Sequence, residues 1–205
     1  MSDVKVKVGI LGASGYTGAE LVRILAHHEA SVITLLTADR RAGRTFGEVF
    51  PHLAHINLPT MIKIEDADWS TVDLIFCALP HGTTQEVIAG LPDHVKVVDL
   101  SADFRLFDPA TYQEWYGAKH AAQDLQKQVV YDLTELHREK IKKARVVANP
   151  GCYPTPVQLA LTPLLESKLV HADDIIIDAK SGVTGAGRSP KEMTLFAEVT
   201  EGIHA

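Results

Sequence analysis

The residues best suited to covalent chemistry lie in one short run, NPGCYPT at residues 149–155. The VVA before it, at residues 146–148, is typical of a short buried strand, and Thr155 is predicted to cap a helix that starts at Pro156. A thiol near the N-terminus of a helix lies at the positive end of the helix dipole, which favours the nucleophilic thiolate form. The pattern therefore indicates that Cys152 is a nucleophile for covalent catalysis, with a buried, inert cysteine as the alternative.

A second motif has the features of a phosphate-binding turn. Residues 4–11 alternate and then become apolar, as an inner strand does. GASGYTG follows at residues 12–18, and residues 19–26 have the apolar spacing of an amphipathic helix. Glycines in such a strand–turn–helix unit let the backbone approach a pyrophosphate at the helix N-terminus. The spacing GxxGxxG is not the common GxGxxG, so the flanking elements carry the prediction of a dinucleotide site. A tight turn that binds no phosphate is the alternative.

The residues after the next predicted strand, 31–36, bear on the choice of cofactor. TADRR occupies residues 37–41. An acid at this place binds the ribose 2′-hydroxyl of NAD, whereas an arginine accepts the 2′-phosphate of NADP. Asp39 stands beside Arg40 and Arg41, so both signals are present. The two arginines favour NADP; an exposed charged loop is the alternative for Asp39 and for one arginine.

The composition excludes several classes of protein. The 205 residues carry a net charge of −6, which argues against a nucleic-acid binder with its basic face. No apolar run reaches the ~20 residues that cross a membrane, and a strand that begins by Val4 leaves no room for a signal peptide. The two cysteines are far apart in sequence, and Cys77 lies in a predicted buried strand. They make no disulfide framework and fit a reducing, cytoplasmic location.

Strands and helices alternate along most of the chain, which predicts an α/β fold with a Rossmann-type, doubly wound, mainly parallel sheet. We assign residues 1–148 to this nucleotide-binding domain and residues 149–205 to the start of an α+β substrate or catalytic domain. The predicted strands are 5–11, 31–36, 60–64, 73–79, 95–100, 145–148 and 174–179. The predicted helices are 19–26, 83–91, 134–143 and the one that starts at Pro156, with a helical turn at 109–116.

Further polar residues follow the strands, where this architecture places its ligands. His81 comes after strand 73–79 and either faces a ligand or is simply solvated. Asp103 and Arg105 come after strand 95–100, where they either pair with each other or leave Arg105 free for an anionic substrate. The glycines and Arg188 of residues 182–188 form either a cradle for phosphate or carboxylate, or a flexible loop.

Taken together, these motifs resemble those of the N-acetyl-γ-glutamyl-phosphate reductases of arginine biosynthesis. Four blocks carry the resemblance in order: GASGYTGAEL at 12–21, SADFR at 101–105, NPGCYPT at 149–155 and SGVTGAGR at 181–188. The first block alone is shared with many NAD(P) enzymes, whereas PGCYPT in order with the others is highly specific. The resemblance extends over essentially the whole chain.

The resemblance implies that Cys152 attacks the acyl phosphate of N-acetylglutamyl phosphate, that phosphate leaves, and that NADPH reduces the resulting thioester to the semialdehyde. It implies a homo-oligomer, a tetramer in the family. We expect no metal, nucleic-acid or membrane partner. The implied substrate contacts are Arg105, Asn149 and Arg188. The implied cofactor contacts are Gly12, Ser14, Gly15, Tyr16, Thr17, Gly18, Thr37, Arg40, Arg41, Pro80, Ser181 and Gly182.

Members of this family are longer than the chain and pair their cysteine with a histidine in a His-Arg-His-x-Pro-Glu motif. That motif is absent from the 205 residues, and His204 comes too early to take its place. The expectation is an incomplete second domain and negligible turnover by this chain alone. The nearest rival is the aspartate-semialdehyde dehydrogenases, which use the same cysteine chemistry, and a non-catalytic NADP-binding protein is the rival from another class.

Overall fold

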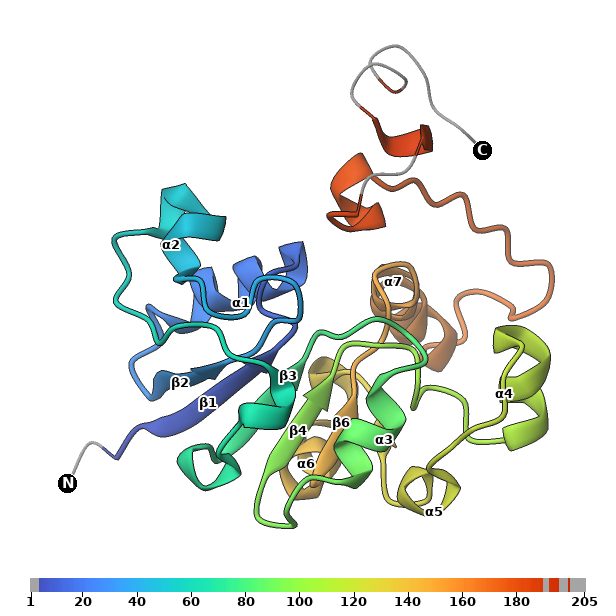
Figure 1. The fold of residues 1–205 in the computed structure, drawn as a ribbon. Coiled ribbons are helices and arrows are strands. Elements are labelled where there is room, and N and C mark those ends of the chain that lie inside the picture. Colours follow the sequence, from blue (N-terminus) through green and yellow to red (C-terminus); the bar gives the residue numbers. More distant parts are fainter. Residues whose placement is uncertain (1–3, 190–191, 196–198, 200–205) are drawn as a thin grey trace.

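A computed structural model of the chain describes residues 4–189, 192–195 and 199 (Figure 1). Its centre is a six-stranded sheet with the order β2-β1-β3-β4-β6-β5, and every strand pair is parallel. The strands are β1 (Val6–Leu11), β2 (Ser31–Leu36), β3 (Leu74–Cys77), β4 (Lys96–Asp99), β5 (Val130–Tyr131) and β6 (Val146–Ala148). The predicted parallel α/β sheet is thus confirmed.

Seven α-helices connect or follow these strands within the described residues. They are α1 (Tyr16–Leu25), α2 (Phe46–Val49), α3 (Thr84–Ala89), α4 (Pro109–Tyr116), α5 (Gln123–Gln126), α6 (Thr134–Lys143) and α7 (Pro154–Glu166). None of the helices in this part of the chain is long and apolar enough to cross a membrane.

The sheet buries both of its faces, as the doubly wound prediction requires. Val8 and Ile10 of β1 belong to a core that also contains Val22 of α1, while Leu11 and Ile75 belong to a second core with Ile88 of α3. Successive strand residues point to opposite faces, so the apolar run of an inner strand supplies both cores.

The order in which successive strands are added to the sheet reverses between β1 and β3, although all strands stay parallel. Strand β2 lies on one side of β1, and the later strands β3, β4 and β6 extend from its other side. In open α/β sheets, ligands bind outside the carboxyl ends of the strands at such a switch point. The turns after β1 and β3 are therefore where this fold positions a site.

Three local predictions were wrong. Residues 60–64 form no strand but a single parallel bridge between Thr37 and Ile62. Residues 174–179 are irregular: they pair with no strand of the described chain, so their apolar side chains stay at the surface, and Ile176 is 93% exposed. Helix α7 begins at Pro154, with Tyr153 as its N-cap, so Thr155 lies inside the helix instead of capping it.

Candidate functional site

A cleft of about 670 Å³ opens at the carboxyl ends of β1, β2 and β3. Seven of the predicted cofactor residues line it: Gly12, Ser14, Gly15, Thr37, Arg40, Arg41 and Pro80. The other lining residues are Ala38, Asp39, Lys63, Ile64, Glu65, Ala78, Leu79, Arg188 and Ser189. The volume is in the range of small-molecule and cofactor sites.

The Gly-rich turn has the geometry that a bound phosphate needs. Gly12 has a φ of +77°, and a Cβ atom there would lie 2.5 Å from the carbonyl oxygen of Ala78, so only glycine fits between β1 and the end of β3. A Cβ atom at Gly18 would lie 2.6 Å from the Cα of Ala13, so α1 packs directly on the turn. The helix is N-capped by Gly15 with no side-chain hydrogen bond. Its first N–H groups, which have no intrahelical partner, suit a pyrophosphate.

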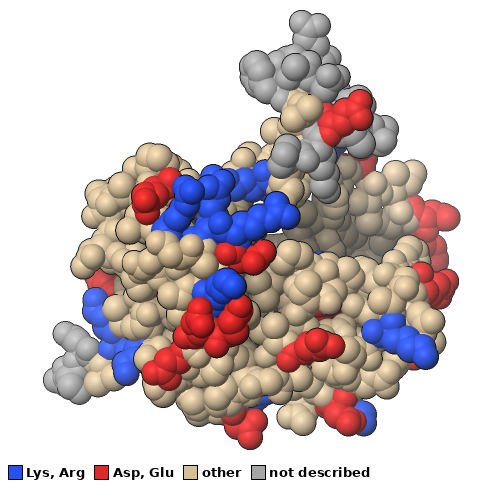
Figure 2. Space-filling model, viewed as in Figure 1, with Lys and Arg blue, Asp and Glu red and all other residues tan. Residues whose placement is uncertain are grey.

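The cleft is basic although the chain as a whole is acidic. Four cations line it (Arg40, Arg41, Lys63 and Arg188) together with two acids (Asp39 and Glu65). Figure 2 shows Lys and Arg side chains gathered on one part of this face. A local positive field attracts an anionic ligand whatever the net charge of the whole protein is. The donor set therefore fits a dinucleotide.

Arg188 lies at this cleft rather than beside the cysteine. Its Nη1 donates to the carbonyl oxygen of Ser14 at 3.0 Å, and its Nη2 donates to that of Val49 at 3.4 Å. The guanidinium carbon lies 4.6 Å from the centroid of the Phe50 ring, which is a cation–π distance. The resemblance implied a substrate contact for Arg188, but the structure places it next to the Gly-rich turn.

Cys152 is exposed and lies two residues before the first residue of α7. The backbone N–H and the hydroxyl of Thr155 both donate to the carbonyl oxygen of Gly151, at 3.0 and 2.9 Å. These bonds fix the turn that carries the thiol. The cysteine thus stands at the N-terminal end of a helix, although the capping residue differs from the one expected.

Arg105 fastens the cysteine loop to the end of β4. Its Nε donates to the carbonyl oxygen of Asn149 and its Nη2 to that of Leu100, both at 3.0 Å. A Cβ atom at Gly151 would lie 2.9 Å from Nη1 of the same guanidinium. Arg105 and Asn149, both expected near the substrate, are thus brought together next to Cys152.

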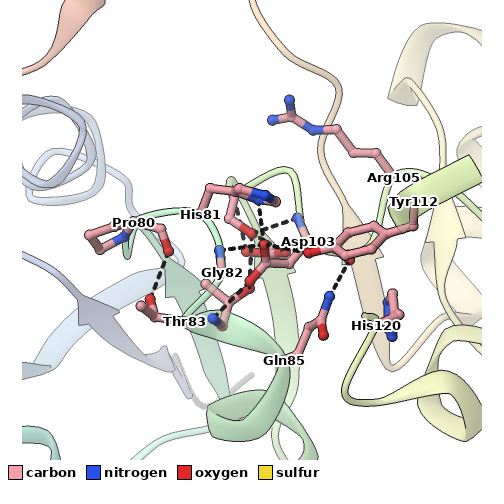
Figure 3. Close-up of polar contacts among 12 residues, drawn as sticks. Pro80, His81, Gly82, Thr83, Gln85, Asp103, Arg105, Tyr112 and His120 are labelled. Atoms are coloured by element: carbon pink, nitrogen blue, oxygen red, sulfur yellow. Dashed lines mark hydrogen bonds and ion pairs between the residues drawn. The ribbon is translucent and has the colours of Figure 1, made fainter. Parts of the chain in front are cut away.

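Asp103 lies two residues before Arg105 and joins their shared loop, residues 101–105, to the loop that follows β3 (Figure 3). It does not pair with Arg105; its Oδ1 lies 2.5 Å from Nδ1 of His81 and accepts from the backbone N–H of Gly82 at 2.7 Å. Its Oδ2 accepts from the N–H and the hydroxyl of Thr84, at 2.9 and 2.7 Å. Burial opposes ionisation of Asp103, but the hydrogen bonds from Thr84 and Gly82 outweigh it and lower the pKa of this carboxyl.

The His81 ring is held on two sides. Its centroid lies 4.3 Å from that of Tyr116, and Asp103 engages Nδ1, which leaves Nε2 as the nitrogen that can face a ligand. His120, by contrast, is buried: its Nδ1 accepts from the N–H of Ala122, and its Nε2 lies 3.1 Å from Oε1 of Gln126. His120 therefore has a structural role, and His81 is the one of the two that lies open to a ligand.

The remaining predicted residues lie outside the cleft lining. Tyr16, Thr17 and Gly18 form the first turn of α1. Ser181 and Gly182 precede a 3₁₀ turn, Val183–Ala186, in an exposed segment. His204 lies outside the described residues. The sequence analysis did not identify Lys63 and Glu65 as residues of the cleft. The apolar pair Met61-Ile62 before them could have indicated it, because Ile62 pairs with Thr37 and so brings this segment to the cleft.

Comparisons with known proteins agree with this geometry. Residues 7–144 match the family described as "Semialdehyde dehydrogenase, NAD binding domain", and residues 152–205 match "Semialdehyde dehydrogenase, dimerisation domain". No group of three or more potential metal ligands occurs among the residues that the structure describes.

Two relatives illustrate the similarity. The chain is 62% identical over 97% of its length to the probable chloroplastic N-acetyl-gamma-glutamyl-phosphate reductase of Arabidopsis thaliana, covering 49% of that protein. It is 60% identical over 98% of its length to N-acetyl-gamma-glutamyl-phosphate reductase of Afipia carboxidovorans, covering 58% of it. The chain therefore spans about half the length of the curated relatives it matches.

Solved structures with the same fold are more distant in sequence. Aspartate semialdehyde dehydrogenase II of Vibrio cholerae, complexed with ASA, matches 80% of this chain and 47% of its own, with a TM-score of 0.56 and 20% identity. The enzyme of Candida albicans, with NADP, matches the same shares with a TM-score of 0.55 and 16% identity. With a Gly-rich nucleotide cleft and a family match over residues 7–144, the chain belongs to the semialdehyde dehydrogenase family, and its similar relatives are N-acetyl-γ-glutamyl-phosphate reductases.

Proposed function

We propose that the protein of which this chain forms the nucleotide-binding and cysteine-bearing part reduces N-acetyl-γ-glutamyl phosphate to N-acetylglutamate 5-semialdehyde, a step of arginine biosynthesis. The observation that carries the proposal is that residues 101–105, at the carboxyl edge of the sheet, contact both the loop after β3 and the loop of Cys152. Through Asp103 this segment holds the loop after β3, which borders the nucleotide cleft at Pro80, and through Arg105 it holds the loop of Cys152. A nucleophile and a cofactor cleft are thereby tied to one loop.

The chain's own residues support the acyl-transfer half of this reaction. The Cys152 thiolate attacks the carbonyl carbon of the acyl phosphate; a C–S bond forms, the C–O bond to phosphate breaks, and phosphate leaves with the electron pair. Arg105 fixes the backbone at Asn149, and the N-terminus of α7 favours negative charge beside the thiol. Bound NADPH would supply the hydride for the reduction that follows.

The choice of NADP over NAD is also part of the proposal. Arg40 and Arg41 both line the cleft, and a guanidinium forms strong, charge-assisted bonds with a phosphate. Asp39 lines the same cleft and is the residue that would instead favour NAD. The family domain that matches is described only as NAD binding.

We also propose a domain division, an oligomeric state and a compartment for this protein. The division into residues 1–148 and 149–205 follows the end of β6 at Ala148. A homo-oligomer, such as the tetramer that the resemblance implies, is supported by the match of residues 152–205 to a dimerisation domain. The cytoplasm remains the proposed compartment because both cysteines are free, although two plant relatives are named chloroplastic.

The experiment that tests the proposed function is substitution of the cysteine in a protein that joins this chain to the remaining length of its relatives. Cys152→Ser should lower kcat for the acyl phosphate by on the order of 10³-fold or more, because a hydroxyl is a far weaker nucleophile than a thiolate. NADPH binding should stay near wild type. Cys77→Ala is the matched control, since Cys77 is fully buried in β3 and burial raises the pKa of its thiol.

A Cys152→Ser enzyme that retains more than about a tenth of the wild-type kcat would contradict a nucleophilic role. The substrate is tested in the same preparation by running the reverse reaction with phosphate, NADP and either N-acetylglutamate semialdehyde or aspartate semialdehyde. Faster turnover of aspartate semialdehyde would favour the rival family. Binding of NADPH without turnover of either compound would favour a non-catalytic NADP-binding protein.

A further inference from the structure

Lys63 is a cation of the nucleotide cleft that neither the family match nor the sequence motifs assign. It follows a short segment fixed to the loop after β2. Ile62 accepts from the N–H of Ala38 at 2.9 Å and donates to the carbonyl oxygen of Leu36 at 3.0 Å. The preceding residue, Met61, is fully buried and accepts from the N–H of Gly43 at 2.7 Å. The backbone that leads into Lys63 is therefore tied to the loop that carries Arg40 and Arg41.

Among the residues that the structure describes, the acid paired with Lys63 is an exposed one, Glu65. The Nζ of Lys63 lies 3.4 Å from Oε1 of Glu65, and the two side chains are 55% and 63% exposed. An ion pair this exposed contributes little free energy and is readily exchanged for a stronger anion. A phosphate monoester carries close to two negative charges near pH 7, so it attracts an ammonium group more strongly than a carboxylate does.

From this arrangement we infer that Lys63 binds the 2′-phosphate of NADP together with Arg40 or Arg41, and that Glu65 holds Lys63 when no phosphate is bound. The inference rests on the proposed function, because it assumes that the cleft takes a dinucleotide. It adds a residue that discriminates between the two cofactors, and it gives Glu65 the role of a competing anion. A flexible ammonium group suits this exchange, since Lys acts as a mobile point charge.

The test uses the 205-residue chain and two nucleotides that lack the nicotinamide half. Isothermal titration with 2′,5′-ADP and with 5′-AMP measures the contribution of the 2′-phosphate alone. Lys63→Met keeps the apolar stem and removes the charge. It should weaken binding of 2′,5′-ADP by about tenfold and change binding of 5′-AMP by less than about twofold. Glu65→Gln should tighten binding of 2′,5′-ADP by about two- to threefold, because the competing carboxylate is gone.

Lys5→Met is the matched control, since Lys5 is an exposed lysine just before β1, at the amino edge of the sheet. It should leave both affinities unchanged. Equal weakening of both nucleotides by Lys63→Met, or no effect on 2′,5′-ADP, would overturn the role of Lys63 and leave the proposed function standing. A wild-type chain that binds neither nucleotide would overturn both.

Discussion

The part of the chain up to Pro150 and the part after it differ in how deeply they bury their apolar side chains. The buried residues of the described chain all lie between Val8 and Pro150. After Pro150 no described residue is buried, although α7 is rich in leucine. Leu169 is 73% exposed and Ile176 is 93% exposed. The first part has a core of its own, whereas the apolar surface of the second part suits contact with another polypeptide surface.

The two parts also differ in how their functional groups are held. In the first part, Gly12 is enclosed by backbone atoms at the nucleotide cleft, and Asp103 of the 101–105 loop is fully buried among its donors. Cys152 is exposed, and its loop is fixed mainly through Arg105 and Thr155. The nucleotide platform is therefore held by buried packing, whereas the loop of the cysteine is held at the surface by a few polar contacts.

The largest expected difference in stability between the two parts comes from truncating one isoleucine in each of them to alanine. Ile75→Ala in β3, where the side chain is fully buried, should lower the free energy of unfolding by about 2–5 kcal/mol because it leaves a cavity. Ile176→Ala should change it by less than about 0.5 kcal/mol in this chain, because the residue is almost fully exposed. Urea unfolding of both variants measures the difference. Similar losses would show that residues 174–179 pack in solution.

A pH-dependent difference is expected from the buried Asp99. Burial raises the pKa of this carboxyl to about 6, in spite of its hydrogen bonds with Ser101. The unfolded value is about 3.9, so between pH 4 and 6 the folded state binds more protons than the unfolded state. Stability should therefore fall as pH rises through this window, by as much as about 3 kcal/mol. Asp99→Asn should flatten that slope in urea unfolding curves.

Asp178→Asn is the control from the second part, where the side chain is 78% exposed and pairs with Lys180. It should leave the slope as it is in wild type. The pKa of Asp103 is shifted in the opposite direction, so its stabilisation is lost only as pH falls below about 4 and does not overlap this window. An Asp99→Asn variant with the wild-type slope would show that the raised pKa of Asp99 does not cause the pH dependence of stability.

Sequence patterns predicted the sheet well because its strands are buried on both faces. The apolar runs 31–36 and 73–79 coincide with or contain β2 and β3, and GASGYTG lies at the switch point as expected. The pattern at 174–179 looked like a strand for the same reason, but an apolar run becomes a strand only when a neighbouring edge accepts its hydrogen bonds. Periodicity carries no information about that partner.

The candidate site was predictable where it depends on local turns and not where it depends on distant contacts. Gly12 and Arg40 could be found from the motifs that contain them. The pairing of Asp103 with His81, 22 residues earlier in the chain, could not, since Arg105 was the nearer charge in sequence. The same holds for Arg188, which reaches Ser14 across 174 residues.

The smallest expected effect on stability comes from replacing one glycine in each part of the chain with alanine. Gly12→Ala places a Cβ atom 2.5 Å from the carbonyl oxygen of Ala78 in a backbone conformation with a φ of +77°. It should lower the free energy of unfolding by about 2 kcal/mol. It should also weaken NADPH binding at least about tenfold, because the turn must move away from the phosphate.

Gly182→Ala is the matched control, since nothing lies within 4 Å of its Cβ position and its φ is −70°. It should change stability by less than about 0.5 kcal/mol and leave NADPH binding by this chain unchanged. Fluorescence titration with NADPH and thermal unfolding measure both quantities. Loss of NADPH affinity in Gly182→Ala alone would mean that the exposed segment, and not the turn after β1, forms the nucleotide site. Loss in Gly12→Ala alone would mean that the turn after β1, and not the exposed segment around Gly182, forms the nucleotide site.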